Sequence, residues 1–151
     1  MAKVLERSQA YNTDLLSWAE RQAAHLRGGR LDQLDVEHLI EELEAMAGKL
    51  RRELKNRLRV LLAHLLKWQM QPRRRSRSWA GTIAEQRDQI DSLLEESPSL
   101  RQDLGEVARS AYSRAVRLAA IETGLPRHAF PPELPYTTAQ ILGEDLSDPE
   151  A

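Results

Sequence analysis

An apolar stripe that recurs every 3.6 residues runs through the middle third of the chain. Apolar residues stand at positions 39, 43, 46, 50, 54, 58, 61, 65 and 68, which is 29 residues in eight steps. This spacing is the period of an unperturbed α-helix, whereas a coiled coil repeats every 3.5 residues. The stripe therefore predicts one long, straight helix that begins after Asp35 and ends before Pro72.

The second half of this helix, from Leu58 to Met70, is apolar on most sides. A helix of this kind is covered on most sides, so we expect this half to lie at the centre of the fold. If the other helices of the chain do not cover all of it, the remaining apolar face becomes a dimer interface. The residues that we assign to the core or to this interface are Leu58, Leu61, Leu62, His64, Leu65, Trp68 and Trp79.

The composition narrows the class of protein. A chain of 151 residues fits one domain with a sizeable core, and with only seven aromatic residues that core must consist mainly of Leu and Ala. Cysteine is absent, which excludes disulfides, thiolate nucleophiles and cysteine metal sites. The N-terminus lacks the apolar core of a signal peptide, and the longest apolar run is too short to span a membrane. We therefore expect a cytoplasmic protein without a membrane partner.

Capping and terminating residues divide the rest of the chain into further helices. Asn12 or Thr13 is expected to cap the first helix, and Ser76 or Ser78 the third. Serine and proline at 97–98 are typical of the start of a fourth helix. The sequence thus predicts an all-α, up-and-down bundle of four main helices, followed by an extended, proline-rich C-terminal segment. The expected boundaries are a flexible N-terminus at 1–10, a single domain at 11–146 and a frayed acidic tail at 147–151.

Five segments, taken together, resemble one protein family. They are YNTDLLSWAERQAAHLR from Tyr11, HLIEELEAMAG from His38, RLRVLLAHLLKWQMQP from Arg57, RSRSWAGTI from Arg75 and ETGLPRHAFP from Glu122. In this order and spacing they are similar to the bacterial family called domain of unknown function twenty-nine, over roughly Tyr11 to Leu146. The resemblance implies a bacterial, all-helical, bundle-like domain without an established activity. It supplies no catalytic residues.

Basic and acidic residues are concentrated in different segments of the chain, although the net charge is only −1. Between Arg51 and Arg77 ten basic residues stand against one acidic residue, and from Pro131 onward there are five acidic residues and no basic ones. The densest basic run, which we call the arginine corner, has three interpretations. It is a solvated helix junction, a contact for nucleic-acid phosphates, or a contact for a protein or an anionic membrane. Its residues are Arg73, Arg74, Arg75 and Arg77.

The histidines give little support to catalysis or metal binding. His38, Glu41 and Glu42 stand on one stretch of helix, but the Glu-x-x-His motif of di-iron bundles is absent. His64 stands among leucines, where a histidine usually forms a hydrogen bond to a carboxylate or carbonyl of the fold. No nucleophile motif and no nucleotide-binding motif is present. We therefore predict no metal and no cofactor.

The sequence favours a non-enzymatic interaction module that self-associates as a homodimer through its long helix, with an unknown protein as a further partner. The alternative is a nucleic-acid-binding or antitoxin-like regulator that uses the arginine corner at Arg73 to Arg77.

Overall fold

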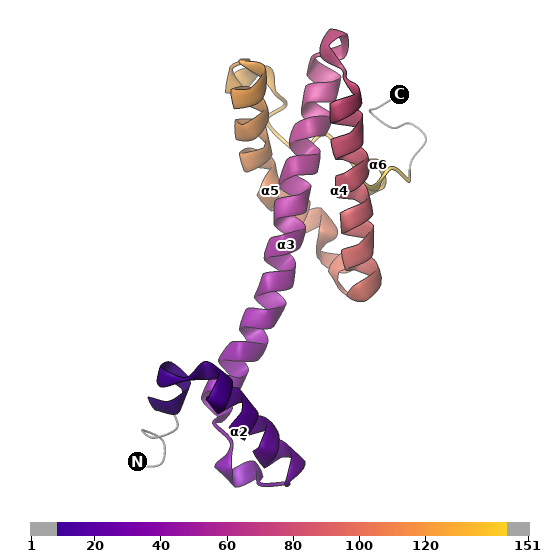
Figure 1. Cartoon of the computed structure of the whole chain (residues 1–151). Coiled ribbons are helices and arrows are strands. Elements are labelled where there is room, and N and C mark those ends of the chain that lie inside the picture. The colour runs from indigo at the N-terminus through magenta and orange to yellow at the C-terminus, as the bar shows by residue number, and fades with distance from the viewer. Residues whose placement is uncertain (1–8, 145–151) are drawn as a thin grey trace. The chain divides into compact units, whose positions relative to one another are not determined.

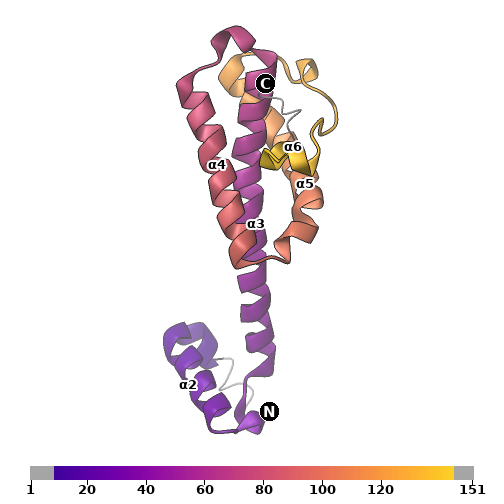
Figure 2. The same cartoon turned by 90° about the vertical axis from the view of Figure 1, so that its right-hand side faces the viewer.

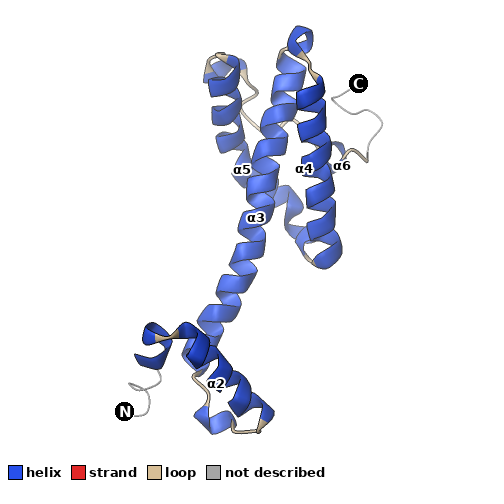
Figure 3. Cartoon of the chain, viewed as in Figure 1, coloured by secondary structure: helices blue, strands red, loops and turns tan. Residues whose placement is uncertain are grey.

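The computed structural model describes residues 9–144, and these residues form helices joined by short loops and turns (Figures 1 and 3). No strand is present in this range, which confirms the predicted all-α class. The contacts separate two compact units, one that ends at Gly48 and one that begins at Lys49. The predicted flexible N-terminus lies almost entirely outside the described residues, as does the predicted acidic tail at 147–151. The single-domain boundaries stay a prediction.

The first unit contains helix α2 (Leu15–Arg27), the short 3₁₀ helix η1 (Leu31–Gln33) and the beginning of helix α3. The expected cap at Asn12 or Thr13 was wrong, because the carboxylate of Asp14 accepts the backbone N–H of Ser17 at 3.0 Å and caps α2. Helix α2 ends before Gly28, and Gly29 has a positive φ of 66°, a conformation that glycine adopts without strain.

Helix α3 (Val36–Met70) is the long helix that the apolar stripe predicts, and it continues through Gly48 without interruption. Its C-terminal part belongs to the second unit, where it lies between helices α4 (Arg77–Glu96) and α5 (Leu100–Thr123) (Figures 1 and 2). Helix α4 runs antiparallel to this part of α3, and α5 runs parallel to it. The core between the three helices is rich in leucine and alanine, as the composition predicts.

The junctions around α4 follow from local chemistry. Pro72 starts the 3₁₀ helix η2 (Pro72–Arg74), and Ser76 then caps α4 by accepting the backbone N–H of Trp79 at 3.2 Å. The expected start of the last long helix at residues 97–98 was wrong by two residues. Ser97 is the C-cap of α4, and α5 begins at Leu100 after its N-cap residue Ser99. Three serine and proline residues in a row offer several possible starts, and the packing of Leu100 into the core decides among them.

The segment after Gly124 packs against the second unit. It contains the 3₁₀ helix η3 (Arg127–Ala129) and the short helix α6 (Thr138–Leu142), which Thr137 and Gln140 cap reciprocally in a capping box. Phe130 and Tyr136 are buried, and the Tyr136 hydroxyl donates a hydrogen bond to the Gln69 side chain at 2.8 Å.

Candidate functional site

The arginine corner lies at the junction of α3 and α4, on η2 and the first turn of α4, and all four of its arginines are exposed. Arg75 already has a partner in the fold. Its Nε donates to the Trp68 carbonyl oxygen at 3.0 Å, and its guanidinium lies 4.9 Å from the centre of the Trp68 ring. For the side chains of Arg73, Arg74 and Arg77 the described part of the chain offers no ion pair. Three of the four predicted arginines are therefore open to a partner.

A buried lysine lies close to this corner. Lys67 is only 6% exposed, and its ammonium group lies 2.7 Å from the Glu122 carboxylate and 4.6 Å from the centre of the Trp79 ring. The sequence analysis missed this ion pair, although a lysine within an otherwise apolar helix segment is a signal for one. Trp68 and Trp79 were expected to act as apolar anchors. Both are half-buried, and each also contacts a cation.

His64 lies one turn before Lys67 on α3 and is half-buried. Its Nδ1 donates to the Val60 carbonyl oxygen at 2.9 Å, which is the kind of partner that the sequence predicts. Burial lowers the pKa of His64, and the positive charge of Lys67 lowers it further, against the opposite effects of the Val60 carbonyl and Glu122. The neutral imidazole is thus the form that this site holds.

The lowered pKa of His64 predicts how the free energy of unfolding depends on pH. The folded pKa lies below the unfolded one, so the unfolded chain binds more protons and stability falls as the pH drops below the ordinary histidine range. We expect His64→Gln to reduce the difference in unfolding free energy between about pH 7.5 and about pH 5. Urea denaturation at both pH values measures this difference, and His128→Gln is the control, because His128 on η3 is exposed. An unchanged difference in His64→Gln would contradict the assignment.

The four leucines that we assigned to the core or to an interface, Leu58, Leu61, Leu62 and Leu65, have no exposed surface. Helices α4 and α5 and the segment after α5 cover them within the chain itself. These four leucines therefore belong to the core of the monomer. His64, Trp68 and Met70 on the same half of α3 are only half-buried, and the interface predicted there stays a prediction.

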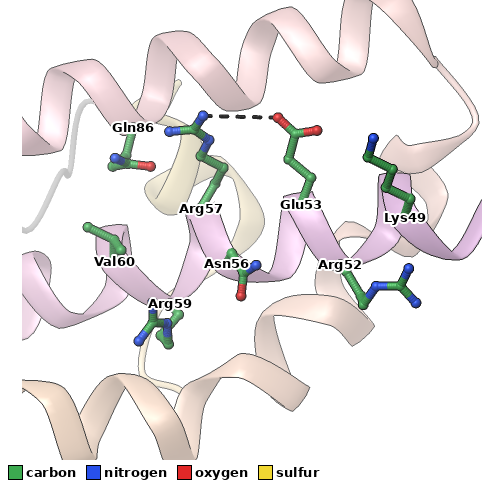
Figure 4. A pocket seen from close by; sticks show the side chains of 8 residues that line it. All are labelled: Lys49, Arg52, Glu53, Asn56, Arg57, Arg59, Val60 and Gln86. Carbon is green, nitrogen blue, oxygen red and sulfur yellow. Dashed lines mark ion pairs between the residues drawn. The ribbon is translucent and has the colours of Figure 1, made fainter.

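A basic hollow of about 550 Å³ lies along α3 in the second unit, and Gln86 of α4 completes its lining (Figure 4). Glu53 and Arg57 form an ion pair at 4.0 Å on the side of α4, and Arg59 points to the opposite side of α3. The lining residues are Lys49, Arg52, Glu53, Asn56, Arg57, Arg59, Val60 and Gln86.

A second hollow, of about 330 Å³, lies between α3 and α5, and we call it the arginine hollow. It shares Arg59 with the first hollow and is lined in addition by Arg114, Arg117, Leu118 and Ile121. Within the described residues no hydrogen bond or ion pair engages the side chains of Arg59, Arg114 or Arg117. The sequence analysis missed this site because its basic residues come from two helices rather than from one run.

The first unit holds a polar cluster around Asp35, which is 7% exposed. Its carboxylate accepts the indole N–H of Trp18 at 3.0 Å and lies 2.7 Å from Nδ1 of His38. Burial alone would raise the pKa of Asp35, but the hydrogen bonds from His38 and Trp18 outweigh burial and hold this pKa below its usual value. The backbone N–H of Asp35 donates to the Gln22 side chain at 2.8 Å. The cluster thus ties α2 to the start of α3.

The possible metal ligands His38 and Glu42 are both engaged within this cluster. The ring of Tyr11 stacks on His38 with centroids 4.0 Å apart, and its hydroxyl donates to Glu42 at 2.6 Å. This hydrogen bond to Glu42 raises the pKa of Tyr11 to about 12, with burial and the charge of Glu42 adding to the effect. Between residues 9 and 144 no group of three or more histidine or acidic side chains is placed to hold a metal ion.

The first unit also exposes most of its apolar side chains. Trp18 is the one buried apolar residue among residues 9–48, whereas eight large apolar side chains there are about half exposed or more. Four of the eight lie on the first part of α3: Val36, Ile40, Leu43 and Met46. Their exposed fractions are 54%, 50%, 59% and 58%. Val36, Ile40, Leu43 and Met46 follow the 3–4-residue spacing of one helix face, and the last two belong to the apolar stripe of the sequence.

Comparison with known proteins gives one match. The family model described as Domain of unknown function DUF29 matches residues 10–147. The chain belongs to this family. No curated protein and no solved structure matches it.

Membership in DUF29 agrees with the resemblance of the five sequence segments and covers both units of this chain. The family's function is not characterised, so the activity of this DUF29 member has to be inferred from its own geometry. None of the helices among residues 9–144 is both long and apolar enough to cross a membrane.

Proposed function

We propose that this DUF29 protein is a non-enzymatic interaction module that self-associates through the exposed apolar face at the start of α3. The observation that carries the proposal is the exposure of Val36, Ile40, Leu43 and Met46 on consecutive turns of one helix. Exposed apolar patches of this kind mark sites of protein association, because burying them removes apolar surface from water.

The small size of the first unit supports the proposal. Residues 9–48 form a body of 40 residues with one buried apolar side chain, Trp18. Bodies of this size need disulfides, metals or a partner to be stable. The chain has no cysteine, and no metal-binding group lies among the described residues. A partner chain supplies the missing cover, and a second copy with two-fold symmetry is the commonest form of such pairing.

The buried titratable groups support a non-enzymatic role, because each has a partner within the fold. Asp35 bonds to Trp18 and His38, and Lys67 pairs with Glu122. Both arrangements tie helices together, which is a structural use of charge. The bacterial, cytoplasmic setting and the arrangement of four main helices as one up-and-down bundle with an extended proline-rich segment remain part of this proposal.

The proposal predicts that Leu43→Arg abolishes the dimer. A guanidinium at the centre of an apolar interface loses its hydration without gaining a partner, which costs far more than the lost contact. Sedimentation equilibrium of the full chain at about 100 µM should show a dimer for the wild type and a monomer for Leu43→Arg. Ala45→Arg is the matched control, since it adds the same charge to the same helix on a different side. A monomeric wild type at this concentration would remove the proposal.

The alternative of a nucleic-acid-binding or antitoxin-like regulator has one specific observation in its favour. Arg73, Arg74 and Arg77 are exposed at the N-terminus of α4, where helix N–H groups add to the attraction for phosphate. Binding of this kind weakens steeply with salt, because each phosphate contact releases counterions. We rank it second, since the chain is close to neutral and Arg75 is already engaged with Trp68.

A further inference from the structure

Ile121 is the one large apolar side chain with an exposed fraction of about half or more among residues 49–144, at 72%. It lies in the arginine hollow, beside Leu118 and the guanidinium groups of Arg114 and Arg117. On α5 these four residues stand at i, i+3, i+4 and i+7, the pattern of one helix face, so they form one continuous surface. The hollow therefore offers a strip of positive charge next to a strip of apolar atoms.

The complementary surface is present at the start of α3. Glu37, Glu41 and Glu44 are exposed and follow the i, i+4, i+7 spacing of one helix stripe. This acidic stripe borders the exposed apolar residues Ile40 and Leu43. The segment Val36–Met46 thus carries acidic and apolar strips side by side, which match the basic and apolar strips of the arginine hollow in charge and spacing.

We propose that the arginine hollow of one copy receives the segment Val36–Met46 of a second copy. In this contact Glu41 and Glu44 pair with Arg114 and Arg117, and Leu43 covers Ile121. The inference rests on the proposed self-association and names the surface that the exposed face of α3 meets. The combination of positive charge and an exposed isoleucine favours an amphipathic acidic helix over a nucleic-acid backbone, because the backbone has no apolar surface to cover the apolar strip.

A closed dimer uses both surfaces of each copy. Every copy carries one acidic segment and one arginine hollow, so a two-fold axis forms the same contact twice. The second contact doubles the buried area, and neither copy then has an uncovered acidic segment or an uncovered arginine hollow. Opposite charges across such an interface also select the correct partner, since like charges placed face to face repel each other.

A charge-swap experiment on the full chain tests the inference. One variant carries Glu41→Arg and Glu44→Arg, and the other carries Arg114→Glu and Arg117→Glu. Each variant alone brings like charges together in both contacts, so the dimer Kd should rise by about 100-fold. In a mixture, the heterodimer pairs the arginine-bearing segment with the glutamate-bearing hollow and keeps the other contact native. Analytical ultracentrifugation of the equimolar mixture should therefore show dimers where each variant alone is monomeric.

The control is Arg73→Glu with Arg74→Glu, which makes the same change in charge at the arginine corner and should leave the wild-type dimer intact. If both charge-swap variants dimerise as the wild type does, or the mixture stays monomeric, the inference is overturned. When Leu43→Arg dissociates the dimer but the charge swaps do not, self-association stands and only this contact is wrong. If Arg114→Glu with Arg117→Glu keeps the dimer and loses affinity for duplex DNA at low salt, the hollow serves nucleic acid and the inference fails.

Discussion

Leu65→Ala in the second half of α3 should lower the free energy of unfolding by about 2–5 kcal/mol. Leu65 has no exposed surface and belongs to the core that α3, α4 and α5 share. Truncation removes buried methyl groups from the core and leaves a cavity that the rigid helices fill only in part, so the transfer and cavity costs add. Leu61→Ala, one turn earlier on the same face, should have an effect of the same size.

Urea denaturation followed by circular dichroism measures these losses. Asn56→Ala is the control, because Asn56 is exposed on α3 and its replacement should change stability by no more than about 0.5 kcal/mol. Losses below about 1 kcal/mol for both leucines would show that their side chains do not lie in a packed core. Leu61 and Leu65 would then be candidates for the interface that the sequence predicts at Leu58–Met70.

The length of α3 was predictable because apolar residues recur at the helical period along the whole segment of the sequence. Leu54, Leu58, Leu61 and Leu65 continue the stripe and are all buried. The same stripe includes Leu43, which is 59% exposed. Periodicity identifies the apolar face of a helix, but it does not say which other element covers that face. The sequence therefore could not show that Leu43 is exposed whereas Leu54, Leu58, Leu61 and Leu65 are buried.

The partners of the polar side chains could not be predicted. Lys67 pairs with Glu122 at a separation of 55 residues, and Tyr136 bonds to Gln69 at a separation of 67. These contacts depend on the register between helices, which a single sequence does not determine. The arginine hollow could not be predicted for the same reason, since its basic residues come from α3 and α5 and lie close together only in the folded chain. The arginine corner was recognisable because its residues are contiguous.

Trp18→Ala should disrupt the first unit and leave the second one folded. The Trp18 side chain is 3% exposed and is the one buried apolar group among residues 9–48. Its ring meets Tyr11 edge to face at 5.0 Å, and its Nε1 donates to Asp35 at 3.0 Å. Truncation of a buried tryptophan costs about 3–5 kcal/mol, and this small unit has no second buried apolar side chain to compensate.

Hydrogen exchange of the full chain distinguishes the two units in one experiment. In Trp18→Ala the amides of α2 should lose their protection, whereas those of α4 and α5 should keep theirs, because locally cooperative units open independently. Trp18→Phe separates packing from hydrogen bonding, since it keeps an aromatic ring but leaves Asp35 without the indole donor. We expect that variant to lose about 1.5–3 kcal/mol of protection in α2, the contribution of one hydrogen bond to a charged group, since the Asp35 carboxylate keeps its bond to His38. Wild-type protection of α2 in Trp18→Ala would show that the cluster around Asp35 holds α2 without the tryptophan.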